Sequence, residues 1–462
     1  MYALLRAIAG VALRWYYRDI HVVGTDRIPR DRPLLLVVNH PNALVDALLV
    51  GWIMPRRVLI TAKATIFKNP VGAALLRWVG VLPLRRTSDE QATGEATAGT
   101  ARNAETFRAV HDALARRRCV LIFPEGKTPD EPALAPLKTG AARMALHARA
   151  SGDAAGLAIL PIGLVFEQKE TPRSRVFVEV GEPILLDLWP AGDNKNAADA
   201  LTAEIEARLR ALTLSYATTD DAARARRLAM SVASLIEPME HLGDRRSLAL
   251  ETAIARRIDR VSTMLSAADE TSRARAEQLL ARLEAVEDEA EAHNIQLDDA
   301  CIELGRRPGM RFVLREGMYL LIGGPVALWG RMNHWLPLRA ARLLAMRKVQ
   351  STADPAMRTI VAGAALILLA YLLQTLLVAW LWGWPVAALY LISLPLAADV
   401  SFRLTDRMRR ARHRARAYLV LRENSALRTR LAAELAGLRN DFLDFDRAVV
   451  GSAPSWAVDA SR

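Results

Sequence analysis

A stretch of forty residues without a charged side chain, residues 359–398, constrains the fold of this chain more than any other feature. Its first part, Ile360–Trp382, is almost entirely apolar. Its 23 residues, at about 1.5 Å per residue, match a hydrocarbon core of about 30 Å. The second part, Val386–Ala398, is short and contains Pro395, so it either crosses with the help of following residues or re-enters. The stretch predicts an apolar membrane hairpin at about 359–398, with a buried hairpin in a soluble protein as the alternative.

Basic residues stand on both sides of this stretch. They are Arg342, Arg347, Lys348 and Arg358 before it, and Arg403, Arg407, Arg409 and Arg410 after it. If both runs cross, the positive-inside rule places both flanks in the cytoplasm. We expect the membrane-associated region to cover residues 311–415, with a shorter apolar segment at 318–329 that is interfacial or partly inserted.

Residues 20–196 show a different pattern, in which apolar β-rich runs alternate with helical stretches. The predicted strands are Ile20–Val23, Leu34–Val38, Val58–Ile60, Val81–Leu84, Cys119–Phe123, Ile159–Val165 and Val176–Val180. The predicted helices include Ala43–Ile53, Gly72–Val79, Ala101–Arg116 and Thr139–Ala150. Strands that alternate with helices favour an α/β domain with a mixed, largely parallel sheet flanked by helices. An all-helical region that contains the membrane hairpin is expected to follow it.

Three further segments have helical periodicity. Residues 1–19 predict an amphipathic helix that lies at a membrane interface, packs on the following domain, or does both. Residues 197–310 predict a charged helical region, an antiparallel hairpin or coiled coil, through which self-association is one expectation. Residues 416–462 predict a C-terminal amphipathic helix and tail.

The charge balance and the cysteines limit the partners. Lys and Arg exceed Asp and Glu by 62 to 50, which gives a net charge of +12 and favours anionic partners. No basic-aromatic motif stands out, so an anionic membrane surface is favoured and nucleic acid is not expected. Cys119 and Cys301 are far apart, and no His or Cys cluster has metal-ligand spacing. We therefore expect no metal.

His40 and Asp46 are the residues with the clearest chemistry. His40 follows the apolar run Leu34–Val38, and Asp46 falls in the first turns of the helix that comes next. A carboxylate that holds an imidazole fixes its tautomer and stabilises the imidazolium, so the pair can act as a general base near neutral pH. A purely structural pair is the alternative.

Four segments in this domain resemble, in order, the conserved blocks of the glycerolipid acyltransferase family, which includes lysophosphatidate and glycerol-3-phosphate acyltransferases. They are Asn39-His40-Pro41-Asn42-Ala43-Leu44-Val45-Asp46, Gly80-Val81-Leu82-Pro83-Leu84-Arg85-Arg86, Phe123-Pro124-Glu125-Gly126-Lys127-Thr128 and Ile159-Leu160-Pro161-Ile162-Gly163. The ordered resemblance around them spans residues 34 to 187. The first and third blocks are specific in combination.

The first block departs from the commonest family pattern in one respect. Five residues, instead of four, separate His40 from Asp46. The longer spacing resembles a branch that includes fungal-type glycerol-3-phosphate acyltransferases. We expect the extra residue to be absorbed in the Pro41-Asn42 turn, with Asn42 capping the helix that starts near Ala43.

The resemblance implies direct transfer of an acyl group from acyl-CoA or acyl-carrier protein, the co-substrate, to a hydroxyl group. His40 is then the catalytic base and Asp46 its partner, and no Gly-x-Ser-x-Gly elbow is present to supply a serine nucleophile. The acceptor, glycerol 3-phosphate or a lysophospholipid, is expected to bind five residues: Arg86, Arg85, Glu125, Gly126 and Lys138. Such a protein works at a phospholipid membrane with its catalytic domain in the cytoplasm, and the resemblance implies no cofactor.

Two other functions fit the same sequence. One is a membrane-anchored scaffold with a degenerate acyltransferase domain, because Lys127 and Thr128 replace the threonine and arginine of the common third block. The other is an acyl hydrolase in which His40 activates water.

Overall fold

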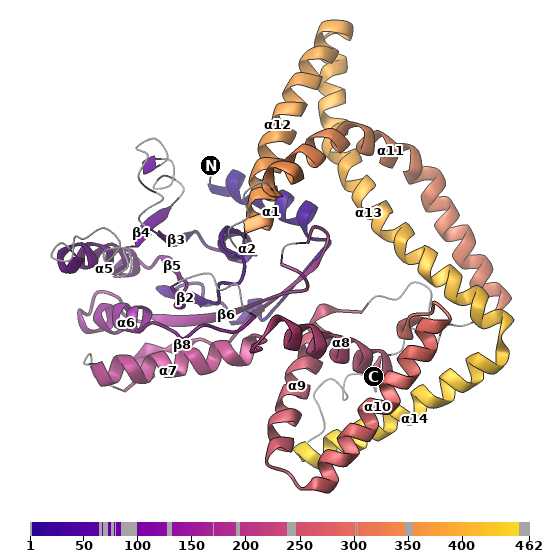
Figure 1. The fold of residues 1–462 in the computed structure, drawn as a ribbon. Helices are drawn as coiled ribbons and strands as arrows, with labels where there is room; N and C mark the ends of the chain where they lie inside the picture. The colour runs from indigo at the N-terminus through magenta and orange to yellow at the C-terminus, as the bar shows by residue number, and fades with distance from the viewer. Residues whose placement is uncertain are drawn as a thin grey trace. The chain divides into compact units, whose positions relative to one another are not determined.

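The computed structural model describes residues 2–63, 67, 73–74, 78, 80–84, 99–126, 132–169, 171–190, 195–237, 246–300, 302, 304–346 and 354–451. The chain forms two compact units. Unit 1 comprises Met1–Thr218 and Leu344–Ala362, and unit 2 comprises Thr219–Leu343 and Gly363–Arg462. The ribbon in Figure 1 shows the sheet of unit 1 and the helices of unit 2.

Unit 1 is an α/β domain, as predicted. Its strands are β1 (Asp19–Val23), β2 (Leu34–Val38), β3 (Val58–Lys63), β4 (Val81–Leu84), β5 (Cys119–Ile122), β6 (Ala158–Phe166), β7 (Arg175–Val180) and β8 (Ile184–Leu185). Its helices are α1 (Tyr2–Tyr16), α2 (Leu44–Ile53), α5 (Gly99–Ala115), α6 (Gly140–Ala150) and α7 (Lys195–Leu212), with short 3-10 turns η1 (Thr25–Arg27) and η3 (Leu186–Leu188). All seven predicted strands are confirmed. The predicted helix at 72–79 lies mostly outside the described residues.

The sheet is mixed and largely parallel. Its order is β1-β7-β6-β2-β5-β3-β4, with β8 paired to β6. The strands β6, β2, β5, β3 and β4 run parallel, whereas β7 and β8 are antiparallel to β6, and β1 is parallel to β7. The carboxyl ends of the five parallel strands therefore meet at one edge. The connection from β6 to β7 and the start of β1 lie at the same edge.

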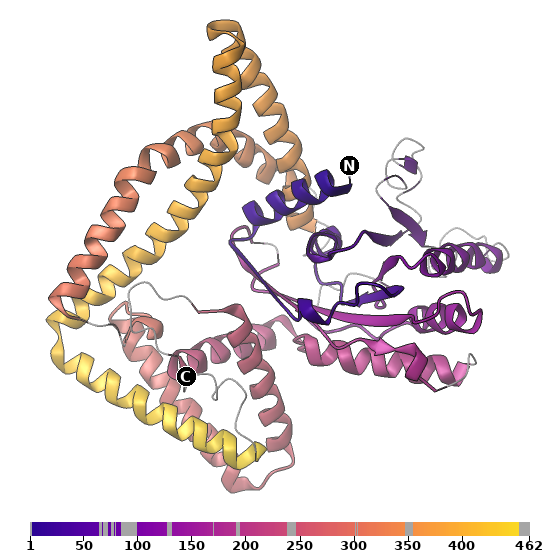
Figure 2. The same ribbon diagram turned by 180° about the vertical axis from the view of Figure 1, so that it is seen from behind.

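Helices cover both faces of this sheet, which explains why the strands are apolar throughout. Leu34, Leu36 and Val38 of β2 pack into the core on the side of α1 and α2. Leu35 and Val37 pack into the opposite core, with α5, α6 and α7. Figures 1 and 2 show the two helical layers from the front and from behind. Unit 1 includes α7, most of whose residues belong to the charged helical region predicted at 197–310.

The helix α1 packs on the following domain, which is one of the two arrangements predicted for residues 1–19. Leu13 is buried in the core that α2 shares, and the Arg6 Nε–H donates to the Trp52 carbonyl at 2.9 Å. Three apolar residues at helical spacing face outward: Leu4, Ile8 and Val11. The packed helix therefore keeps an exposed apolar stripe.

The fourth sequence block has a packing role in the strand β6. A Cβ atom on Gly163 would lie 2.3 Å from the Leu212 carbonyl oxygen at the end of α7. Only glycine permits the backbone of α7 to approach the strand this closely.

Unit 2 is all-helical, as predicted for the region after the sheet. Its elements are α8 (Thr219–Ile236), α9 (Leu248–Ser266), α10 (Glu270–Ala292), η4 (Leu297–Asp299), α11 (Arg306–Met346, up to Leu343), α12 (Asp354–Trp382, from Gly363 on), α13 (Trp384–Glu423) and α14 (Ser425–Val450). The helix α14 packs against α8, α9 and α10. Buried Leu279, Leu283 and Val286 of α10 therefore serve packing within the chain.

The apolar helices differ in part from the predicted hairpin. By length and composition, three helical segments suffice to cross a membrane: Arg306–Leu343, Ala362–Trp382 and Trp384–Glu423. The segment 318–329 belongs to the 41-residue helix α11, and the second apolar run continues through Pro395 within the 40-residue helix α13. Polar contacts join these helices, because His334 Nε2 lies 2.7 Å from the Tyr371 hydroxyl and Tyr390 donates to Asn333 at 2.6 Å.

Candidate active site

The candidate site lies at the edge where the parallel strands of unit 1 end. The strand β2 ends at Val38, and Asn39 continues its pairing by side-chain bonds. Its Nδ2 donates to the Leu164 carbonyl at 3.0 Å, and its Oδ1 accepts from the Leu164 amide at 2.8 Å. Asn39 thus fixes the backbone from which His40 projects.

His40 and Asp46 meet at this edge. The distance from His40 Nδ1 to Asp46 Oδ2 is 2.9 Å, and the Asp46 side chain is fully buried while that of His40 is 14% exposed. The same Oδ2 accepts the Asn42 amide at 2.8 Å. An ionised Asp46 requires the proton of the imidazole on Nδ1, which leaves Nε2 as the nitrogen that accepts a proton from a substrate.

The turn at residues 41–43, which joins His40 to the helix α2, contains one strained residue, Ala43. Ala43 adopts φ 47° and ψ −127°, a conformation that strains a residue with a side chain by about 1–3 kcal/mol. The prediction that Asn42 caps the helix α2 is wrong. The Asn42 Nδ2 instead donates to the Tyr17 hydroxyl and to the Lys169 carbonyl, each at 2.9 Å. This strained turn brings Asp46 back to His40.

The third block supports His40 from the neighbouring strand β5. The Phe123 ring stacks on the imidazole with centroids 3.8 Å apart and an angle of 15° between the planes. Glu125 is 2% exposed, and its two oxygens accept from two backbone amides, His40 at 2.7 Å and Ala135 at 2.9 Å. The Glu125 carboxylate therefore links the backbone of His40 to the backbone of the connection that precedes α6.

Gly126 and Lys138 lie beside these hydrogen bonds of Glu125. Gly126 has φ 70°, and a Cβ atom there would lie 3.2 Å from both Cδ and Cε of Lys138. The Lys138 amide also donates to the Pro124 carbonyl at 2.9 Å. The methylene groups of Lys138 thus pack over Gly126. The exposed Lys138 side chain places an ammonium next to the third block.

Burial dominates the electrostatics of the two carboxyl groups. It raises the pKa of Asp46, while the hydrogen bond and charge of His40, the Asn42 amide and the Lys169 ammonium lower it. Burial likewise raises the pKa of Glu125, and the amides of Ala135 and His40 oppose this. The donors around each carboxyl group therefore stabilise its ionised form.

Replacing Glu125 with glutamine is expected to lower kcat about 10- to 100-fold, because one buried backbone amide then faces an amide donor and loses its acceptor. The KM for the acceptor should change less than about threefold, since a displaced His40 affects the reaction more than binding. Steady-state kinetics of full-length Glu125→Gln in vesicles measures both constants. Glu182→Gln is the control, because Glu182 is 63% exposed in its pair with Arg27. A raised KM with unchanged kcat would show instead that Glu125 binds the acceptor.

The structure brings together five of the predicted site residues: His40, Asp46, Glu125, Gly126 and Lys138. Arg85 and Arg86, together with Lys127 and Thr128, lie outside the described residues. Sequence reasoning missed Tyr17 and Lys169, which reach the dyad from the start of β1 and from the connection between β6 and β7. Within the described part of the chain, no group of three His, Cys, Asp or Glu side chains is arranged to hold a metal ion.

Comparison with known proteins gives three similarities. The acyltransferase family model matches residues 19–165. Glycerol-3-phosphate O-acyltransferase 2 of Saccharomyces cerevisiae is 41% identical over 85 residues, which span 18% of this chain and only 11% of the yeast protein. The crystal structure of the 1-acyl-sn-glycerophosphate acyltransferase PlsC from Thermotoga maritima aligns with 44% of this chain and 79% of its own, at 19% identity and a TM-score of 0.32.

Proposed function

We propose that this chain transfers a fatty acyl group from an acyl thioester to a hydroxyl of glycerol 3-phosphate, because residues 19–165 match the acyltransferase family model and part of the chain is similar to a glycerol-3-phosphate acyltransferase. The observation that carries the proposal is the buried dyad, with His40 Nδ1 2.9 Å from Asp46 Oδ2 at the carboxyl edge of the sheet. The local identity to the yeast enzyme favours glycerol 3-phosphate over a lysophospholipid as the acceptor.

The proposed reaction is a direct transfer. The acceptor hydroxyl gives its proton to His40 Nε2 while its oxygen attacks the thioester carbonyl carbon, forming a tetrahedral intermediate. The carbon–sulfur bond then breaks, and the imidazolium returns the proton to the leaving thiolate. Asp46, held by the Asn42 amide, offsets the positive charge that His40 carries between these steps.

We further propose that the protein acts at a membrane, where acyl chains are delivered. The three long apolar helical segments support this, as does the outward apolar stripe of α1. With α12 and the apolar start of α13 as the two crossings, the arginines and lysine that flank residues 359–398 favour a catalytic unit on the cytoplasmic side. The acyl donor is proposed to be acyl-CoA, with acyl-carrier protein as the other thioester to compare.

An acceptor screen tests this function. The full-length chain in phospholipid vesicles receives labelled acyl-CoA or acyl-carrier protein with glycerol 3-phosphate, lysophosphatidate or another lysophospholipid. The expected product is acylated glycerol 3-phosphate. Folded protein that consumes neither thioester with any acceptor would overturn the proposal and favour the scaffold.

A further inference from the structure

Asn42 joins the dyad to two parts of the chain that are distant in the sequence. Its backbone amide donates to Asp46 Oδ2 at 2.8 Å. Its side-chain Nδ2 donates one hydrogen to the Tyr17 hydroxyl and the other to the Lys169 carbonyl, each over a distance of 2.9 Å. Asn42 is fully buried. The place of its backbone amide, and with it the contact to Asp46, therefore depends on these two acceptors.

Tyr17 is packed tightly in the segment between α1 and β1. Its ring lies edge-on to that of Tyr16, with centroids 4.8 Å apart, and its centroid is 5.7 Å from that of Phe166. The residue is 1% exposed. Its hydroxyl donates to the Lys169 carbonyl at 3.5 Å, which leaves an oxygen lone pair for the side chain of Asn42. The Tyr17 hydroxyl is thus a fixed acceptor for that side chain.

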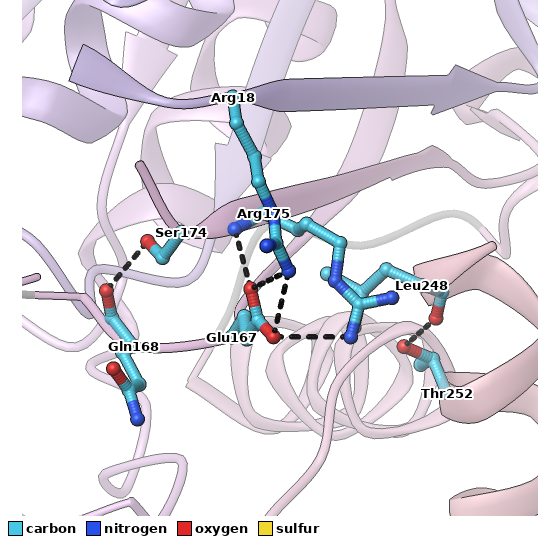
Figure 3. A network of polar contacts seen from close by, with 7 residues as sticks. All are labelled: Arg18, Glu167, Gln168, Ser174, Arg175, Leu248 and Thr252. Carbon is cyan, nitrogen blue, oxygen red and sulfur yellow. Dashed lines mark hydrogen bonds and ion pairs between the residues drawn. The ribbon is translucent and has the colours of Figure 1, made fainter. Parts of the chain in front are cut away.

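The Lys169 carbonyl is held by the ion pairs of the connection between β6 and β7. Glu167 accepts from the Arg175 amide at 2.9 Å, from Arg175 Nη2 at 3.1 Å and from Arg18 Nη2 at 3.2 Å. Figure 3 shows both arginines directed at the Glu167 carboxylate. These bonds fix the start of the connection against β1 and β7, so the backbone that follows offers Asn42 its second acceptor at a defined place.

The turn that follows Asn42 needs this support. Ala43 has φ 47° and ψ −127°, and a strained conformation of this kind persists only where the surrounding structure holds it. The Asn42 carbonyl accepts from the Val45 amide at 3.0 Å, so Asn42 is bonded on both sides of the strained residue. Loss of its side-chain bonds lets the turn relax and moves its amide away from Asp46. That amide also opposes the rise that burial causes in the pKa of Asp46.

Resting on the proposed function, we infer that Tyr17 and Asn42 are positioning residues for acyl transfer. The Tyr17 hydroxyl holds the Asn42 side chain, and the Asn42 amide in turn holds Asp46 against His40. Because both residues are fully buried, they act on the reaction through the dyad and not by contact with a substrate. Tyr17 lies outside all four sequence blocks, so the inference extends the site to the segment between α1 and β1.

The test uses Tyr17→Phe, which removes the hydroxyl and keeps the packed ring. In the full-length chain in phospholipid vesicles, this variant is expected to lower kcat about 5- to 20-fold, because Asn42 loses one of its two acceptors. The KM values for both substrates should stay within about twofold. The acid limb of the pH profile should move to higher pH, because a weaker bond from the Asn42 amide leaves the pKa of Asp46 higher.

Tyr2→Phe is the matched control. The Tyr2 hydroxyl also bonds to backbone, donating to the Gly51 carbonyl at 3.4 Å and accepting from the Val58 amide at 3.3 Å. These contacts lie at the end of α2 away from the dyad. The control should keep the kcat and the pH profile of the wild-type chain.

A double variant shows whether the two residues act together. Asn42→Ala is expected to lower kcat about 10- to 100-fold, since both side-chain bonds are lost. Adding Tyr17→Phe to it should lower kcat less than about twofold further, because the hydroxyl acts through the Asn42 side chain. If Asn42→Ala does not fold, the kcat and pH profile of Tyr17→Phe decide the matter alone.

Three results would overturn the inference. Tyr17→Phe with the kcat and pH profile of the wild-type chain and only a lower melting temperature would give Tyr17 a purely structural role. A raised KM with unchanged kcat would place the hydroxyl in substrate binding. Losses that multiply in the double variant would show that the two residues act independently. The proposed function fails separately, if the wild-type chain itself transfers no acyl group.

Discussion

Replacing His40 with alanine is expected to lower kcat for acyl transfer by about three to four orders of magnitude, the upper range for loss of a general base. The imidazole supplies the Nε2 that takes the hydroxyl proton, and Phe123 and Asp46 hold it in one orientation. The measurement is the transfer of labelled acyl groups to glycerol 3-phosphate by the full-length variant in vesicles.

His147→Ala is the matched control, because this histidine is exposed on α6. The control should transfer at the wild-type rate. Wild-type activity in His40→Ala would remove the histidine from the mechanism. A matching circular dichroism spectrum of the two variants shows that any loss is not a loss of folding.

Replacing Asp46 with asparagine is expected to lower kcat about 100- to 1000-fold, because the imidazolium loses its counter-charge and the tautomer of His40 is no longer fixed. Asparagine keeps an oxygen that can accept the Asn42 amide, so the fold of the turn should survive. The same transfer assay gives kcat, and KM should change little because Asp46 contacts no substrate. Asp26→Asn, at an exposed position in η1, is the control.

The pH dependence of the wild-type chain follows from the burial of Asp46. Burial raises the pKa of this carboxyl group, so it takes up a proton at a higher pH than an exposed aspartate does. Transfer should therefore fall as the pH decreases through that raised value.

An Asp46→Asn variant as active as the wild-type chain would show that the carboxylate does not support His40.

The strands and the dyad could be predicted because their signals are local. Buried parallel strands are continuous apolar runs, and β2 and β5 have that form. His40 follows such a run, and Asp46 lies in the first turn of α2. Spacing alone could therefore bring the two side chains together. The residues that support them were harder to predict. The position of Asn42 just before α2 suggests a helix cap, but its side chain donates hydrogen bonds to the Tyr17 hydroxyl and the Lys169 carbonyl.

Contacts that depend on the order of the strands could not be predicted. Tyr17 and Lys169 are 152 residues apart, and they meet only because β7 returns antiparallel to β6 and pairs with β1. No short pattern in the sequence encodes that pairing. The helix α10 gives the same lesson in unit 2. Its apolar face suggested a hairpin or a coiled coil, and it packs on α14, more than a hundred residues further along the chain.

One measurement tests the central claim most directly: the fate of the labelled acyl group with and without glycerol 3-phosphate. The full-length chain in phospholipid vesicles is given labelled acyl-CoA, and lipid products are separated from free fatty acid. Direct transfer by the His40–Asp46 dyad predicts labelled acylglycerol phosphate at a rate that follows the acceptor concentration, with negligible fatty acid in its absence. Release of free fatty acid at the same rate whether or not the acceptor is present would contradict it.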